Sequence, residues 1–299
     1  MKRVSLFIFI AASFSLAACD SDNNADAERF SVSLSGVDPL TNGFHYEGWL
    51  IINGAAVAAG KFNVTSTGTL VDLNGVTIAG GEFEVDADVA AATAYILTIE
   101  PAGDTNSTPS STHYLSGDIG GGTASLSVGH GAALGNSFST ATGNYILATP
   151  TDGPDTNENS GVWFLDPTGA APAAGLDLPT LPDGWAYEGW AVVGGTPVTS
   201  GTFLSVEGAD DFDGFSSTMP APLFPGEDYL VNAPTGMTFP FDIAGGKVVI
   251  SIEPSPDDNS APFTLKPLVG DVSSAALDHT LYGMDNKSSA FPTGTVTIK

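Results

Sequence analysis

The sequence predicts an all-β protein made of two tandem β-sandwich domains. Short runs rich in Val, Ile, Thr and aromatic residues alternate with clusters of Gly, Asn, Asp and Pro. After residue 19, no stretch keeps a helical apolar period over three turns. Many short strands at roughly ten-residue spacing, in units of about 125 residues, favour Greek-key, immunoglobulin-like sandwiches.

An internal duplication supports the two-domain interpretation. The motif Tyr46-Glu47-Gly48-Trp49 recurs as Tyr187-Glu188-Gly189-Trp190, at an offset of 141 residues. A second block, Ile99-Glu100-Pro101, recurs as Ile252-Glu253-Pro254 at an offset of 153 residues. The larger offset predicts about twelve extra residues in the second copy, between residues 203 and 248, where acidic and Pro-rich stretches are typical of a surface-loop insertion.

The duplication suggests where the domains begin and end. We expect the first repeat at residues 30–150 and the second at residues 161–299. Residues 151–160 are interpreted as a polar linker, residues 1–18 as a signal peptide, and residues 19–29 as a flexible tether.

The N-terminus is typical of an exported bacterial lipoprotein. Lys2 and Arg3 precede an apolar run from Val4 to Ala18, which fits a secretory signal but is too short to span a bilayer. The run ends Leu16-Ala17-Ala18-Cys19, which resembles the lipobox, where the Cys thiol is acylated and the chain is cut before it. We therefore expect a lipid anchor on Cys19, with the membrane as partner, and an extracytoplasmic location at either envelope membrane.

Charge and cysteine content exclude several functions. The formal net charge is −26, and removal of a signal that contains Lys2 and Arg3 takes it to −28. Nucleic acid is excluded as a partner because eight Lys and Arg residues cannot supply a basic footprint. Cys19 is the only cysteine, so a lipidated chain has no thiol for a disulfide, a zinc site or a nucleophile.

The repeated motifs, in their order along the chain, resemble those of the extracytoplasmic domain of the anti-sigma-K factor family. A Tyr-x-x-Trp strand, an Asn-Gly or Gly-Gly turn and a Gly-x-Phe strand precede a Glu-Pro strand end and a Pro-containing loop. These elements occupy residues 46–62 with 99–117, and 187–203 with 252–270. Family members that restrain a sigma factor are similar in having a cytoplasmic helical domain and a membrane span, which are absent here. The resemblance therefore implies a fold and a location, not the regulatory activity.

Four repeated carboxylates are the main catalytic candidates. Glu47 with Glu100, and Glu188 with Glu253, could form the carboxylate pair of a glycoside hydrolase. A structural role is favoured, because Glu47 alternates onto the strand face of Trp49, and Glu100 ends a strand where exposed backbone amides need acceptors. We expect no catalytic residue.

The repeated aromatic residues could form a platform for sugars. A Trp in a central strand is more typical of a sandwich core, however, so a core position is predicted for Tyr46 with Trp49 and for Tyr187 with Trp190.

Two acidic loops and four histidines are weak metal-site candidates. The loops at residues 155–161 and 210–214 alternate oxygen ligands, but neither has the full spacing of a calcium loop. None of the histidines has metal-binding spacing; they are His45, His113, His130 and His279. We expect no metal and no cofactor.

These observations favour a non-enzymatic cell-envelope lipoprotein whose paired domains bind an envelope protein or a glycan, or stiffen a surface assembly. An accessory regulator that works with a membrane anti-sigma or sensor protein is a second hypothesis. A polysaccharide hydrolase is a third; it requires Glu47 and Glu100, or their counterparts, to converge in an open cleft about 5–10 Å apart.

Overall fold

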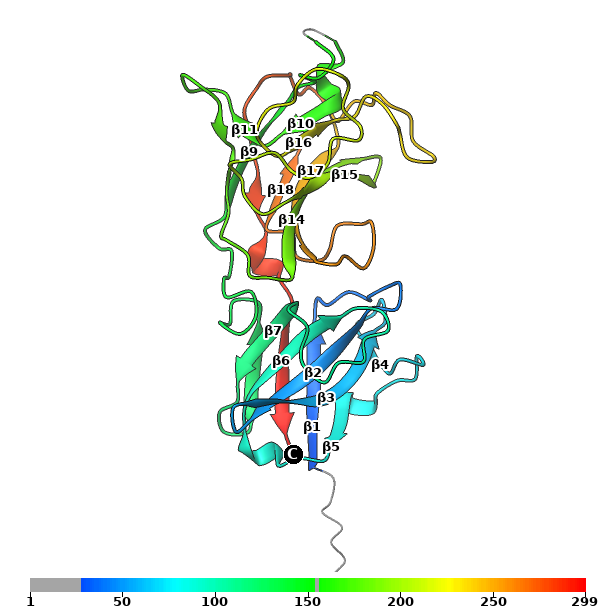
Figure 1. The fold of residues 1–299 in the computed structure, drawn as a ribbon, viewed down its shortest axis with the longest axis vertical. Helices are drawn as coiled ribbons and strands as arrows, with labels where there is room; N and C mark the ends of the chain where they lie inside the picture. Colours follow the sequence, from blue (N-terminus) through cyan, green and yellow to red (C-terminus); the bar gives the residue numbers. More distant parts are fainter. Residues whose placement is uncertain (1–27, 154–155) are drawn as a thin grey trace, which may run out of the picture.

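The computed structural model describes residues 28–153 and 156–299, and its antiparallel sheets confirm the all-β sandwich class. The molecule is elongated, with two β units arranged along its long axis (Figure 1). The helical elements in the described ranges are short 3-10 turns: η1 (Ala79–Gly81), η2 (Val89–Ala91), η3 (Glu158–Ser160) and η4 (Ser288–Ala290). The expected signal peptide and Cys19 lie outside the described residues, whereas the last two residues of the expected tether begin strand β1.

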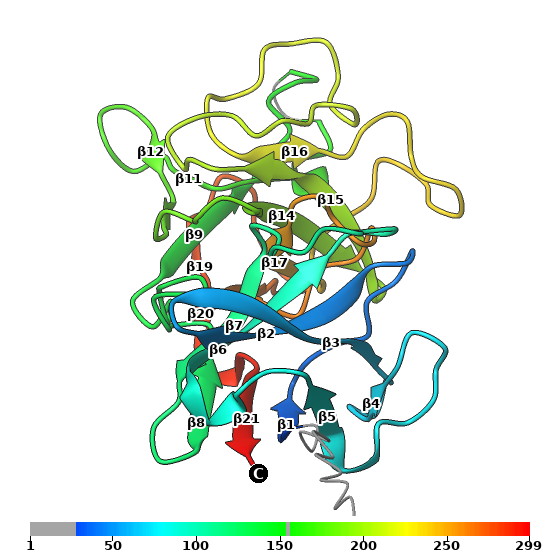
Figure 2. The same ribbon diagram turned by 60° about the horizontal axis from the view of Figure 1, so that its bottom comes forward.

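The first unit contains a nine-stranded sheet in the order β4-β3-β2-β6-β7-β8-β21-β1-β5. Its strands are β1 (Glu28–Ser35), β2 (His45–Ile52), β3 (Ala55–Val64), β4 (Leu70–Val71), β5 (Glu82–Val85), β6 (Ala92–Glu100), β7 (His113–Asp118), β8 (Thr123–Ser127) and β21 (Thr293–Ile298). The sheet bends where β7 and β8 share one pairing, Ser116 with Ser127. Phe83 of β5 then packs on both Phe30 and Phe62, with ring centroids 5.5 Å apart, so β5 closes over β3 (Figure 2).

The second unit has two facing sheets. One has the order β15-β14-β17-β18-β20, and the other has the order β13-β9-β10-β16, with β19 paired to β9. Their strands are β9 (Thr142–Leu147), β10 (Gly161–Trp163), β13 (Leu176–Asp177), β14 (Trp185–Val193), β15 (Thr196–Phe203), β16 (Gly226–Asp228), β17 (Lys247–Pro254), β18 (Leu268–Asp271), β19 (Tyr282–Gly283) and β20 (Asp285–Asn286). A small hairpin of β11 (Leu165–Asp166) and β12 (Ala173–Ala174) completes the unit.

The strand order reflects the duplication. The run β3-β2-β6-β7 of the first unit corresponds to β15-β14-β17-β18 of the second. In both units the central hairpin turns through two residues with positive φ, Asn53-Gly54 and Gly194-Gly195, as a tight two-residue β-turn requires. A register shift follows at the same place, between Gly48 and Trp49 and between Gly189 and Trp190.

The last strand of each sequence copy lies in the unit built mainly by the other copy. Strand β21 ends the second copy, yet it pairs with β1 and β8 of the first unit. Strand β9 ends the expected first copy, yet it pairs with β10, β13 and β19 of the second unit. The expected limits, residues 30–150 and 161–299, therefore describe the repeat in the sequence but not the membership of the sheets.

The segment expected to be a linker packs against the second unit. Thr151 is buried, and its backbone N–H donates to Asp228 Oδ2 at 2.8 Å. Thr149, two positions earlier, donates its hydroxyl to the Thr156 carbonyl at 2.7 Å. The described part of residues 151–160 is therefore a structural part of the second unit and not a spacer between units.

The two units share a continuous hydrophobic core and a hydrogen-bonded joint. The ring of Tyr114 in the first unit contacts those of Trp185 and Phe263 in the second, at centroid distances of 6.1 and 5.4 Å. Asp258 accepts hydrogen bonds from the Thr41 N–H at 2.9 Å and, through its carbonyl, from the Asn42 amide at 2.7 Å. None of the helices in the described ranges has the length and apolar character needed to cross a membrane.

Candidate functional site

Each unit carries three carboxylates at equivalent positions, two on its central strands and one in the loop that follows the second of these strands. In the first unit these are Glu47 of β2, Glu100 of β6 and Asp104, which we call the first triad. The offset of 141 residues places Glu188 of β14 opposite Glu47 in the repeat alignment, and the offset of 153 residues places Glu253 of β17 and Asp257 opposite Glu100 and Asp104. Glu188, Glu253 and Asp257 are called the second triad. The two triads are the strongest candidates for a functional site because buried carboxylates need a partner for their charge.

The sequence motif explains how the strands present these groups. Gly48 permits the close approach of β6, because a Cβ there would lie 2.1 Å from the Tyr95 hydroxyl; at Gly189 it would lie 2.2 Å from Ser200 Oγ. The neighbouring tyrosines tie the strand to the preceding loop in both units: Tyr46 donates its hydroxyl to the Asp38 carbonyl at 2.8 Å. Tyr187 and the Pro179 carbonyl repeat this bond at 2.6 Å in the second unit.

A lysine pairs with two carboxylates of the first triad. Lys61 of β3 places its Nζ 3.3 Å from Glu47 Oε2 and 3.4 Å from Asp104 Oδ2. Glu47 is 2% exposed and Glu100 is 1% exposed, so neither carboxylate opens into a cleft. Glu100 is held by the Ser110 backbone N–H at 3.0 Å. These partners support the structural interpretation of Glu47 and Glu100.

The pKa values in the first triad follow from this pairing. Burial raises the pKa of Glu47, although the hydrogen bond and charge of Lys61 oppose the rise. For Lys61, burial alone would lower the pKa, but the pairs with Glu47 and Asp104 outweigh burial and raise it. The ammonium and the carboxylates therefore stabilise each other's charged forms.

The second triad has the same carboxylates but a different cation environment. Glu188 is 7% exposed and Glu253 is 2% exposed, whereas Asp257 is exposed. One carboxylate oxygen from each lies within 4.8 Å of the other two. Thr202 occupies the position of Lys61, and no ion pair among the described residues involves the triad.

Backbone and hydroxyl donors hold the second triad in place. The Phe263 N–H donates to Glu253 Oε1 at 2.9 Å, as Ser110 donates to Glu100 in the first unit. The Thr199 hydroxyl donates to Glu188. These bonds fix two of the carboxylates but supply no positive charge.

Without a cation, the acids of the second triad have strongly shifted pKa values. Burial raises the pKa of Glu188 to about 7, and the charges of Asp257 and Asp211 add to the rise. Burial likewise raises the pKa of Glu253 to about 8, with a contribution from Glu188. Burial also raises the pKa of Asp257. Clustered acids with raised pKa values mark a functional-site candidate.

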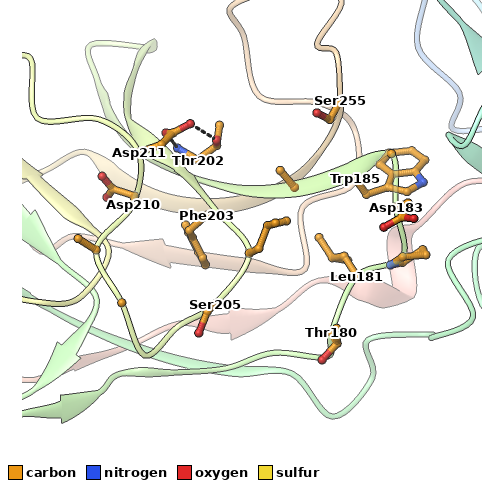
Figure 3. Close-up of a pocket in the computed structure, with 16 residues that line it drawn as sticks. Thr180, Leu181, Asp183, Trp185, Thr202, Phe203, Ser205, Asp210, Asp211 and Ser255 are labelled. Carbon is orange, nitrogen blue, oxygen red and sulfur yellow. Dashed lines mark hydrogen bonds between the residues drawn. The ribbon is translucent and has the colours of Figure 1, made fainter.

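A cavity of about 710 Å³ lies beside the strands that carry the second triad, although no triad residue lines it (Figure 3). Its lining includes Ala186 and Thr202, which pair across the strands with Glu253 and Glu188. The side chains that give it character are apolar Leu181, Trp185, Phe203 and Leu204 and acidic Asp183, Asp210 and Asp211. Figure 3 shows Thr202 bound to Asp211, through its N–H and its hydroxyl, at 2.8 Å each.

Residues 204–246, which join β15 to β17 and contain the insertion, are called the inserted segment; they add further buried acids near this cavity. Burial raises the pKa of Asp210 to about 7, although the Gly226 and Phe212 N–H groups donate to it. Glu227 has a pKa raised by burial to about 7, against hydrogen bonds from Ser216 and backbone amides. The acidic side of this region thus consists of carboxylates bound by donors of the protein itself.

The other sequence candidates have structural partners. Trp49 is buried and its Nε1 donates to Thr98 Oγ1 at 2.9 Å; Trp190 is also buried and donates to Ser251 Oγ at 2.7 Å. Neither tryptophan is therefore an exposed platform for sugars, and the predicted buried position is confirmed. Asp155, in the first acidic loop, lies outside the described residues.

The four histidines are separated in the fold. His45 is buried beside the first triad, and burial, followed by the Lys61 charge, lowers its pKa. His113 Nδ1 lies 2.9 Å from the Ala132 carbonyl, and His130 Nε2 lies 3.3 Å from Asp118. His279 is exposed. No histidine belongs to the acidic group that the described residues bring within metal-binding distance.

The contribution of Lys61, Asp104 and Asp257 was not apparent from the motifs. The signal was nevertheless in the repeat alignment, because the offset of 153 residues equates Asp104 with Asp257, and the offset of 141 equates Lys61 with Thr202. Comparisons with protein-family models, curated proteins and solved structures found no match to this chain. The likeness to the anti-sigma-K family consequently stays an interpretation of the motifs.

Proposed function

We propose that this protein is a non-enzymatic lipoprotein of the cell envelope, anchored through Cys19, whose second unit binds a protein partner. The observation that carries the proposal is that the N-terminal strand and the inserted segment lie toward opposite ends of the molecule. Strand β1 begins, and β21 ends, at one end of the long axis, whereas the inserted segment of the second unit lies toward the other end (Figure 1). An anchor that precedes β1 would direct the insertion away from the membrane.

The inserted segment has the surface chemistry of a binding region. The large exposed apolar residues of the described chain are Leu73, Val76, Leu204, Met219, Leu223, Val231 and Leu277. Four of these seven lie between residues 204 and 231, in the inserted segment. Exposed apolar side chains gathered on loops favour a role in protein contacts.

Charge further narrows the partner. From residue 204 to residue 246 the chain contains seven Asp and Glu residues and no Lys or Arg. Four of these acids are exposed, Glu207, Asp211, Asp213 and Asp242. Exposed apolar side chains in an acidic segment complement a partner that presents apolar side chains flanked by Lys and Arg. We therefore favour an envelope protein with a basic, apolar contact region over a glycan, because the two tryptophans of the repeated motif, Trp49 and Trp190, are buried.

The anchor is tested with wild type and Cys19→Ser expressed in a host that processes lipoproteins. We expect wild type to carry acyl chains by intact mass and to fractionate with membranes, and the variant to be unacylated and soluble. An unlipidated wild type in the soluble fraction would contradict the proposal.

The binding role is tested separately on soluble protein. Immobilised wild type is titrated with a basic amphipathic peptide and with its counterpart in which Lys is replaced by Glu. We expect salt-sensitive binding of the basic peptide alone, weakened about tenfold in a Leu204→Ser, Leu223→Ser variant. A matched Leu73→Ser, Val76→Ser variant in the first unit is expected to bind as wild type. Equal binding of both peptides would contradict the assigned partner chemistry.

A further inference from the structure

The two triads differ at one chemically decisive position. Glu47, Glu100 and Asp104 correspond to Glu188, Glu253 and Asp257, and the backbone amides that hold Glu100 and Glu253 also correspond. In the first unit a cation, the Lys61 ammonium, contacts Glu47 at 3.3 Å and Asp104 at 3.4 Å. In the first unit, therefore, this arrangement of three carboxylates binds a cation that the chain itself supplies.

Among the residues that the structure describes, no cation of the second unit forms an ion pair with its triad. Thr202 replaces Lys61 and binds Asp211 of the insertion, which places a further negative charge near Glu188. Lys266 lies close enough to Glu253 for the glutamate to influence its pKa, but its Nζ donates to the carbonyls of Pro262 and Phe263. It forms no ion pair with the triad in the described structure.

We propose that Glu188, Glu253 and Asp257 form a calcium site, in which Ca²⁺ takes the place held by the Lys61 ammonium in the first unit. Three carboxylates without nitrogen or sulfur ligands suit a hard cation. Two oxygens bound to one Ca²⁺ at 2.3–2.6 Å lie at most about 5 Å apart, whereas the limit for Mg²⁺ is about 4 Å. The ligand oxygens of the triad, all within 4.8 Å of one another, lie inside the limit for Ca²⁺. Ca²⁺ also accepts irregular sets of protein oxygens more readily than Mg²⁺, which demands a near-ideal octahedron and keeps several waters.

The position of the triad lets the ion enter from solvent and lets it act on the contact between the two units. Asp257 is exposed, so the ion enters from solvent and keeps water ligands on that side. Asp258, the next residue, holds Thr41 and Asn42 of the first unit. A bound ion therefore fixes the loop that joins the two units, and its binding stabilises the folded chain.

The inference is tested on the full soluble chain with CaCl₂ alone. Calorimetric titration after removal of metal with a chelator is expected to show one Ca²⁺ per chain above the weak background of an acidic surface, with a Kd of about 0.1–1 mM. Saturating Ca²⁺ is expected to raise the Tm by about 5 °C. MgCl₂ at the same ionic strength is expected to raise the Tm less.

Three variants assign the site. Glu253→Gln keeps the side-chain shape and is expected to remove the titrated ion and the Tm rise. Glu207→Gln, which removes an exposed acid of the insertion, is the charge-matched control and is expected to retain both. Thr202→Lys restores the ammonium of the first unit and is expected to raise the Tm without Ca²⁺ while removing the response to Ca²⁺.

The decisive contrast is between Glu253→Gln and Glu207→Gln. Identical Ca²⁺ titrations for these two variants and wild type would overturn the site, because the binding would then come from the acidic surface as a whole. A folded Thr202→Lys variant that still responds fully to Ca²⁺ would overturn the equivalence with Lys61. None of these variants changes Cys19 or the exposed leucines of the inserted segment. Failure of the calcium site would therefore leave the proposed anchor and binding role to be tested separately.

Discussion

The two carboxylate triads of this protein show how a duplicated arrangement diverges when one residue changes. In the first unit Lys61 contacts Glu47 and Asp104, and a buried charge receives its counter-charge from the neighbouring strand. In the second unit the equivalent Thr202 binds an additional acid, and burial raises the pKa of Glu188 to about 7. Both units keep the three carboxylates, but among the described residues only the first unit pairs them with a cation of the chain.

The two repeats of the sequence also do not coincide with the two structural units. Strand β21 belongs to the second copy and completes the first sheet, while β9 belongs to the expected first copy and lies in the second unit. Each unit depends on a strand that the other copy supplies. Local changes in one copy can therefore act on the unit built by the other.

Removal of residues 291–299, which include β21, is expected to have the largest effect. The edges of β1 and β8 lose their partner, so the first unit is expected to lose its cooperative unfolding while the second retains it. Hydrogen exchange measured by peptide is the readout, with β1 unprotected and β9 protected. Removal of Lys299 alone is the control. Loss of protection in β9 rather than β1 would contradict the strand exchange.

Lys61→Met is expected to lower the free energy of unfolding by about 2 kcal/mol. The substitution leaves the buried Glu47 carboxylate without its partner, and the estimate is at the low end because the Lys61 side chain is 30% exposed. Thr202→Met, its counterpart, is expected to cost less than about 1 kcal/mol, since only hydrogen bonds to Asp211 are lost. Urea unfolding of both variants measures the difference, and equal costs would show that Lys61 does not neutralise its triad.

The pH dependence of stability is expected to separate the triads. The pKa of Glu253 is raised by burial to about 8 in the folded chain, above its ordinary value of 4.5. A raised carboxyl pKa favours folding fully below pH 4.5, and this contribution is lost as the pH rises through 8. In chelator, the Tm of wild type is expected to fall by about 5 °C between pH 5 and pH 8.5.

Glu253→Gln is expected to flatten this pH profile, because an amide does not titrate. Glu207→Gln serves again as the charge-matched control and is expected to follow wild type. Thermal unfolding at four pH values is sufficient. A profile for Glu253→Gln as steep as that of wild type would assign the pH dependence to other groups.

The smallest expected effect concerns the matched tryptophan bonds. Thr98→Val and Ser251→Ala remove the acceptors of Trp49 and Trp190, and each is expected to cost about 1–2 kcal/mol because a buried N–H loses its partner. Similar costs would support equivalent roles of the two tryptophans. Denaturant unfolding gives the values, and a negligible cost in one unit would show that the two have diverged here as well.

Much of the fold could be predicted from local patterns. Runs of β-branched and aromatic residues between turn residues indicated strands, and the repeated Tyr-Glu-Gly-Trp motif located the equivalent central strands β2 and β14. The same motif carried the glycines that permit close strand packing and the tyrosines that bind back to the preceding loop. The carboxylates Glu47, Glu100, Glu188 and Glu253 were found in this way and lie in the two triads.

The remaining part of the site depended on contacts between distant residues. Nothing in the local sequence of Lys61 shows that its ammonium meets Asp104, 43 positions later, or that Thr202 turns toward Asp211. The residues of the acidic loop 210–214 made it only a weak calcium candidate, and they did not show that Asp210 and Asp211 accept hydrogen bonds from Gly226 and Thr202.

The sequence by itself determined the strand content, the duplication and the residues that each repeat must keep, because these depend on side-chain alternation, turn chemistry and identity between copies. Only the tertiary structure decided which strand completes which sheet and which carboxylates lie together without a cation. A strand has the same local backbone preferences whichever sheet it joins. The local sequence therefore does not show that β9 and β21 lie in the unit built mainly by the other copy. Burial and charge proximity, which distinguish the two triads, arise only when β2 meets β6 and β14 meets β17.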